Sequence, residues 1–214
     1  MSPFTKVVGE AAPIVIDNID TDVIIRIERL TEADQSRLGD YAFEMLRYRE
    51  DGTEDESFAL NRPRFRHAPI LIAGRNFGCG SSREGAVTAL VMLGIKAILA
   101  PSFGDIFYGN CFQNGVLPVA LPQPEIQRLA AEATECPWPT TVDLQSQVVQ
   151  SAKGRVVPFE IDGFRRDALL AGLDDIGQTV TLLPEILQWQ EWDRARRPWL
   201  WIDNPERLSA GGGD

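Results

Sequence analysis

The chain has 214 residues, a formal net charge of −10 at pH 7 and an ordinary apolar content of 44%. This acidic balance argues against a nucleic acid or an anionic membrane as partner, because phosphate binding depends on clustered Lys and Arg. No apolar run approaches the roughly 20 residues of a membrane span and the N-terminal segment lacks the apolar region of a signal peptide, so we expect a cytoplasmic protein.

Residues that commonly bind metals are few and scattered. Cys79, Cys111 and Cys136 are far apart and form no CxxC pair, and His67 is the only histidine. Such spacing suggests neither a disulfide framework nor a zinc site. We therefore expect no cofactor to be held by this chain's own residues.

The first apolar segment, residues 13–25 (PIVIDNIDTDVII), predicts a strand, a polar turn and then a second strand or the start of a helix. Asp22 lies in this turn, where side-chain oxygens usually bond to nearby backbone N–H groups. Residues 28–61 are highly charged and poorly periodic, with a short helix that carries Arg47 and Arg49. Taken alone, both arginines are expected at the surface.

The central stretch, residues 74–86 (GRNFGCGSSREGA), lies between an apolar run at 68–73 that predicts a buried strand and a helical pattern at 86–94. Its four glycines permit positive φ angles and leave room for a ligand close to the main chain. Ser81 or Ser82 is expected to cap the helix, and the unpaired N–H groups that follow would favour an anion.

Strands and helices alternate after this stretch. Strands are expected at 95–100 and 116–121, with a short helix between them at 103–115 and another helix at 124–134. This alternation favours parallel strands joined by right-handed crossovers. Ligands bind at the carboxyl ends of such strands, which is where residues 74–83 would lie.

The C-terminal third favours strands within residues 141–161, a short helix that ends near Gly172 and a second helix at 184–197. Four tryptophans cluster around this last helix: Trp189, Trp192, Trp199 and Trp201. They could pack within the chain or seat a partner subunit. Residues 209–214 are expected to be a disordered tail.

The central stretch does not fit the common nucleotide-binding motifs. The third glycine of GxGxxG is replaced by Arg83, and the GxxxxG that ends at Gly85 is not followed by the lysine and hydroxyl residue of a P-loop. The remaining groups suit a small carboxylate, which Arg83 could bind through two parallel hydrogen bonds. A catalytic role for a serine is also open, because a helix N-terminus beside an arginine can stabilise an alkoxide.

Four ordered motifs resemble one known family. They are NIDTDVII, LNRPRF, GRNFGCGSSREGA and APSFGDIFYGNCFQNGVLPV, and they span residues 13–121. The chain resembles the small subunit of 3-isopropylmalate dehydratase, which is equivalent to the swivelling domain of aconitase. The resemblance implies an α/β fold with β/β/α layers, a mainly parallel core sheet and a C-terminal helical extension. Residues 1–130 would form the swivel core with the substrate loop, and residues 131–214 would complete that domain and add the Trp-rich extension.

The resemblance also implies an activity. Members of this family are hydro-lyases that interconvert 2-isopropylmalate and 3-isopropylmalate by dehydration and rehydration in leucine biosynthesis. The small subunit acts only with a large subunit, which carries a [4Fe-4S] cluster. A leaving hydroxide needs a Lewis acid, and this chain lacks the cysteines of a cluster, so we expect it to supply half of an active site.

Several residue roles follow from the resemblance. Ser81 matches the serine that removes the substrate proton in aconitase-like enzymes. Ser82 and Arg83 match residues that hold the substrate carboxylate, and Asp22 matches an acidic residue near the site. Arg47 resembles an arginine of the corresponding small-subunit segment and is expected to contact the substrate.

Two positions depart from the family pattern. Gly85 stands where histidine usually follows the SRE segment, and Arg75 stands where an acidic residue is common. Both would change the wall of the site and leave the substrate open, so an alternative is a related dehydratase for a methylmalate, citraconate, maleate or homoaconitate-type acid. Another alternative is a non-catalytic anion-binding module. Whether Arg47 or Arg49 reaches the substrate is likewise open.

Overall fold

The computed structural model describes residues 1–32, 34–81 and 83–201. Its internal contacts divide the chain into two compact units, Met1–Asp174 and Asp175–Asp214. The tail expected at residues 209–214 lies outside the described residues, and the boundary expected near residue 130 stays a prediction. No helix among the described residues is both long enough and apolar enough to cross a membrane.

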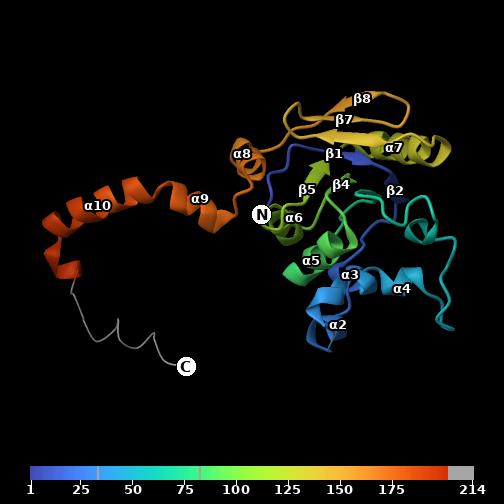
Figure 1. The fold of residues 1–214 in the computed structure, drawn as a ribbon, viewed down its shortest axis with the longest axis horizontal. Coiled ribbons are helices and arrows are strands. Elements are labelled where there is room, and N and C mark those ends of the chain that lie inside the picture. The colour runs from blue at the N-terminus through green and yellow to red at the C-terminus, as the bar shows by residue number, and fades with distance from the viewer. Residues whose placement is uncertain (33, 82, 202–214) are drawn as a thin grey trace. The chain divides into compact units, whose positions relative to one another are not determined.

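The first unit contains two four-stranded sheets (Figure 1). The parallel sheet has the order β2-β3-β4-β5 and consists of β2 (Ala11–Ile14), β3 (Ile70–Ala73), β4 (Ala97–Ala100) and β5 (Leu117–Ala120). The antiparallel sheet has the order β1-β6-β7-β8 and consists of β1 (Lys6–Gly9), β6 (Thr140–Asp143), β7 (Val148–Gln150) and β8 (Val156–Pro158). The expected parallel core is confirmed, and β1 is a strand that the sequence pattern did not predict.

Eight α-helices belong to the described part of the first unit. They are α1 (Thr21–Ile24), α2 (Ile27–Glu32), α3 (Leu38–Tyr41), α4 (Glu44–Arg47), α5 (Glu84–Leu93), α6 (Asp105–Gln113), α7 (Gln123–Glu135) and α8 (Gly163–Ala171). The short helix expected around Arg47 is divided in two, because Phe43 takes a left-handed conformation with φ 58° between α3 and α4. In the second unit, α9 (Asp175–Thr181) and α10 (Leu183–Arg196) form the expected helical extension.

The parallel sheet is buried on both faces, as its continuous apolar strands require. Leu71 and Ala73 join a core with residues of α1, α3 and α5, whereas Ile70 and Ile72 point to the other face. There they pack with α7 and with the antiparallel sheet. Figure 1 shows the parallel strands between α7 and the helices α3 and α5. The expected layered α/β architecture is therefore confirmed.

The parallel register brings three loops to one edge of the sheet. Ile14, Ala73 and Ala100 end β2, β3 and β4, and these strands are neighbours in the sheet. The loops that follow them, residues 15–20 and 74–83 and the segment 101–104, therefore start side by side. This edge contains most of the residues that the sequence singled out.

Candidate functional site

Backbone hydrogen bonds join the first two of these loops. The Gly78 N–H donates to the Ile19 carbonyl at 2.7 Å, and the Thr21 N–H donates to the Cys79 carbonyl at 3.0 Å. Asp20 and Cys79 thus face each other as in a parallel ladder. The NIDTD segment and the glycine-rich stretch therefore form one continuous rim beyond β2 and β3.

The third loop is attached in the same way. The Phe77 N–H donates to the Ser102 carbonyl at 3.1 Å, and the Gly104 N–H donates to the Phe77 carbonyl at 2.9 Å. The Ser102 hydroxyl also accepts from the Asn76 N–H at 2.9 Å. Residues 74–80 are consequently fixed on both sides, so the rim is a rigid support for the residues that follow it.

The glycines of this stretch admit neighbouring protein groups. A Cβ atom at Gly74 would lie 2.2 Å from the Ile16 carbonyl oxygen, and one at Gly78 would lie 2.2 Å from Cγ of Phe107. By contrast, the nearest atom to a Cβ at Gly80 would be 3.4 Å away. Gly80 has φ +92°, a conformation that glycine adopts at little cost. Of these three glycines, Gly80 is therefore the one with free space beside it, and it directly precedes Ser81.

Ser81 is exposed, and its backbone is held by α1. The Thr21 hydroxyl, on a side chain that is 1% exposed, donates to the Ser81 carbonyl at 3.1 Å. Helix α5 begins only at Glu84, with Arg83 as N-cap and no side-chain cap. The expectation that Ser81 or Ser82 caps this helix is wrong, because Arg83 occupies the N-cap position. Ser82 lies outside the described residues.

Arg83 forms an ion pair with Asp22. The Arg83 side chain is 18% exposed and that of Asp22 is 50% exposed, so the arginine is the more covered partner of the pair. Asp22 is free for this contact because Asp20 caps α1, accepting from the Val23 N–H at 2.8 Å. The ordinary turn-bonding role considered for Asp22 thus belongs to Asp20.

The structure brings Ser81, Arg83 and Asp22 together but places Arg47 elsewhere. Arg47 is 8% exposed, which corrects the expectation of a surface arginine. Its Nε donates to Oδ1 of Asn61 at 3.1 Å, and Nδ2 of Asn61 donates to the Arg47 carbonyl at 2.6 Å. Asn61 belongs to the LNRPRF motif, and no role was predicted for it from the sequence.

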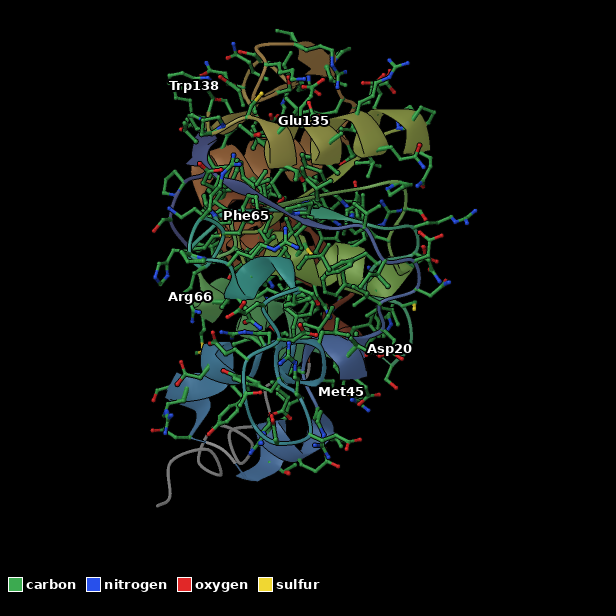
Figure 2. All side chains as sticks on the ribbon, turned by 90° about the vertical axis from the view of Figure 1, so that its right-hand side faces the viewer. Asp20, Met45, Phe65, Arg66, Glu135 and Trp138 are labelled. Carbon is green, nitrogen blue, oxygen red and sulfur yellow. The ribbon has the colours of Figure 1, made fainter. Side chains whose placement is uncertain are left out.

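A separate cavity of about 510 Å³ is lined by Arg47 together with Glu54, Arg66, His67 and others, but not by Ser81, Arg83 or Asp22. Figure 2 shows Asp20, at the start of α1, and Met45, in α4, on one side of the parallel sheet, and Glu135, in α7, on the other side.

Arg49, the alternative to Arg47, lies in an exposed loop. Its Nη2 lies 3.4 Å from Oδ1 of Asp55. A role for either arginine at the substrate stays a prediction.

Each of the two positions that depart from the family pattern has a close neighbour in the fold. The Arg75 N–H donates to Oδ1 of Asp17 at 2.7 Å, and its Nη2 donates to Oδ2 at 3.0 Å. Both hydrogen bonds lower the pKa of the Asp17 carboxyl, and the bond from the backbone N–H has the larger effect. At Gly85, a Cβ atom would lie 2.5 Å from Cδ2 of Leu30. An apolar side chain of α2 therefore lies against the first turn of α5.

The cysteines do not come together in the fold. Cys79 lies on the rim, Cys111 is buried in α6 and Cys136 follows α7, and all three are free thiols. Burial raises the pKa of the Cys111 thiol, which disfavours the thiolate form that binds metals. Within residues 1–32, 34–81 and 83–201, no three His, Cys, Asp or Glu side chains are placed to hold a metal ion. These residues do not fit an iron–sulfur cluster.

Comparison with known proteins gives consistent matches. The sequence profile "Aconitase C-terminal domain" matches residues 1–124. The chain is 46% identical over 201 residues to a 3-isopropylmalate dehydratase small subunit from Dinoroseobacter shibae, covering 94% of this chain and 100% of that protein. It is 47% identical over 201 residues to a protein of the same name from Rhodospirillum rubrum, covering 94% and 97%. The crystal structure of 3-isopropylmalate dehydratase from Methanocaldococcus jannaschii matches with a TM-score of 0.63 and 28% identity, covering 87% of this chain and 99% of that one.

Proposed function

The chain belongs to the aconitase C-terminal domain family and to its 3-isopropylmalate dehydratase small subunits, and on this basis we propose that it acts in the interconversion of 2-isopropylmalate and 3-isopropylmalate. The reaction removes a proton and a hydroxide from adjacent carbons, and water then adds back with the opposite placement. The step belongs to leucine biosynthesis. The observation that carries the proposal is the rim on which Ser81 and the Arg83–Asp22 pair lie together.

Ser81 is the proposed base. Its hydroxyl is on an exposed residue, its backbone is fixed through Thr21, and it is not the cap of α5. A serine can take a proton from carbon only if its alkoxide is stabilised. The first N–H groups of the ten-residue helix α5 and the nearby guanidinium of Arg83 are suited to supply that stabilisation.

Arg83 is the proposed carboxylate-binding residue. The Asp22 carboxylate holds the guanidinium at the rim before substrate arrives, which reduces the loss of side-chain freedom on binding. A substrate carboxylate would then accept two parallel hydrogen bonds from the planar guanidinium. Ser82 is proposed to donate to the same carboxylate. Arg47 is proposed to act at the substrate only in the assembled enzyme.

The departing hydroxide needs a Lewis acid, which we assign to a [4Fe-4S] cluster on a large subunit. The name of the relatives supports such a partner, and the dispersed cysteines of this chain support placing the cluster there. We also propose a cytoplasmic location, which agrees with three unpaired thiols. The partners are then the large subunit and a small carboxylic acid.

Mixing the chain with its large subunit under anaerobic conditions tests this function. We expect absorbance of the unsaturated acid to develop from 3-isopropylmalate, with a higher kcat/KM than from methylmalate, citraconate, maleate or homoaconitate-type acids. A higher kcat/KM for one of those acids would replace the substrate and keep the reaction class. A complex that acts on none of them would contradict the proposal.

A further inference from the structure

The second unit exposes an unusual amount of apolar surface. Helix α9 buries none of its residues, and α10 buries Asp193 alone. Within residues 175–201, the described part of this unit, nine large apolar side chains are exposed: Ile176, Val180, Leu182, Leu183, Leu187, Trp189, Trp192, Trp199 and Leu200. Single exposed apolar residues are common, but a concentration of this kind marks an interaction site.

The apolar side chains of α10 lie on two sides of the helix. Leu183 and Leu187 are four residues apart and therefore share one side, whereas Trp189 and Trp192 are three apart and share another. Since each residue turns the helix by about 100°, Leu187 and Trp189 point in nearly opposite directions. A helix with apolar groups on opposite sides needs cover on both. Its binding site is therefore a groove that encloses it.

The end of α10 is fixed without a partner. Asp193 accepts from Nε of Arg197 at 2.6 Å and from Nε1 of Trp201 at 2.8 Å. The guanidinium carbon of Arg196 lies 5.2 Å from the centre of the Trp192 ring. These contacts order the segment in advance and lower the entropy lost on binding. Trp and Arg are also the residue types that contribute most to affinity at protein interfaces.

The extent of the matched sequence indicates which partner covers this surface. The match to the Dinoroseobacter shibae small subunit includes 201 residues, or 94% of this chain. The match therefore extends into the second unit, Asp175–Asp214. The family profile, by contrast, ends at residue 124. A domain of a longer chain is held near its partner domain by the covalent link, whereas a separate subunit needs additional contacts to stay bound.

We propose that residues 175–201 dock into an apolar groove of the large subunit. Trp189 and Trp192 are buried against one wall of this groove, and Leu183 and Leu187 against the other. The inference depends on the proposed function only for the identity of the partner.

Substitution of two tryptophans in the full chain tests this surface. The double variant Trp189→Ala/Trp192→Ala should raise the Kd for the large subunit at least about 30-fold, as expected for two buried aromatic anchors. At saturating concentrations its kcat should equal that of the wild type. Trp138→Ala is the matched control, since Trp138 is 67% exposed in the first unit and lies at the outer edge of that unit in Figure 2. Its Kd should not change.

Leu187→Ala, on the opposite side of α10, should also raise the Kd. Thermal unfolding of each free variant should stay close to that of the wild type, because the altered side chains are about half exposed and belong to neither buried core. An unchanged Kd for the double variant would overturn the inference, as would a wild-type chain that does not bind the large subunit. A wild-type homodimer that the double variant disrupts, with an unchanged Kd for the large subunit, would assign the surface to a second copy and overturn it too. A complex that responds as expected but dehydrates no acid would support the interface and contradict only the proposed function.

Discussion

Asp22 and Arg83 lie 61 residues apart in the chain and form an ion pair between α1 and the N-terminus of α5. The contact ties the loop after β2 to the loop after β3 at the place where Ser81 is exposed. Because the Asp22 side chain is half exposed, the pair adds little to the stability of the fold, and its main effect is to orient Arg83.

Replacing Arg83 by lysine should impair catalysis while the charge is kept. An ammonium group cannot donate two parallel hydrogen bonds to a carboxylate, so kcat/KM should fall about 100-fold. Steady-state kinetics of the complex with the large subunit would measure this. Arg128→Lys is the control, since Arg128 is exposed on α7 and pairs with Glu125, and its kcat/KM should stay at the wild-type value. Equal kinetics for the two variants would remove the assigned role of Arg83.

Thr21→Val should lower kcat without much loss of stability. Valine has a similar volume but no hydroxyl, so the Ser81 carbonyl loses its hydrogen bond and the serine its fixed position. We expect kcat to fall about 10-fold, and the free energy of unfolding to fall by about 1 kcal/mol or less. Thr21→Ser keeps the hydroxyl and should retain most of the activity. If the valine variant were as active as the serine variant, Thr21 would not position Ser81.

Gly78→Ala should destabilise the chain strongly. The added Cβ would meet the Phe107 ring, and the residue has φ +70°. We expect a loss of about 2–4 kcal/mol in the free energy of unfolding, measured by urea denaturation. Gly109 in α6 has no atom within 4 Å of an added Cβ, so Gly109→Ala should be neutral or stabilising by about 0.5–1 kcal/mol. Similar stabilities of the two variants would contradict the packing described for the rim.

The contact between Asp17 and Arg75 should make stability depend on pH. The Arg75 N–H and guanidinium bind the charged carboxylate and lower its folded pKa below the ordinary 3.8. The contribution of this contact is therefore complete above the ordinary pKa and disappears as the pH falls through the folded pKa. The stability difference between the wild type and Asp17→Asn should be larger at about pH 6 than at about pH 2–3. A difference that is the same at both pH values would show that the carboxylate charge does not matter.

The fold could be predicted where apolar runs are bounded by glycine, proline or polar residues. The apolar runs of β3, β4 and β5 are bounded in this way, and these strands belong to the sheet that is buried on both faces. Strand β1 was missed because only Val7 of its four residues is buried, and so short a half-exposed segment gives no clear period. The division between α3 and α4 was missed as well, since a left-handed phenylalanine is not a recognisable sequence signal.

The candidate residues could be predicted from motifs, but their contacts could not. The spacing of residues within the motifs does not predict the ion pair between Asp22 and Arg83. The two residues meet because they follow β2 and β3, which are neighbours in the parallel sheet. The cap expected at Ser81 or Ser82 is wrong because α5 begins later, at Glu84 with Arg83 as N-cap, although serine is the residue type that favours this position. Arg47 was expected at the surface because its buried partner, Asn61, lies in a different motif.

The proton-abstracting role of Ser81 is the central claim, and the kcat of Ser81→Ala in the assembled enzyme tests it most directly. Alanine removes the hydroxyl and leaves the backbone contact with Thr21 in place. We expect kcat for 3-isopropylmalate to fall about 1,000-fold, as for the loss of a general base, while the Kd for the large subunit stays at the wild-type value. A Ser81→Ala complex that retains the wild-type kcat would contradict the account.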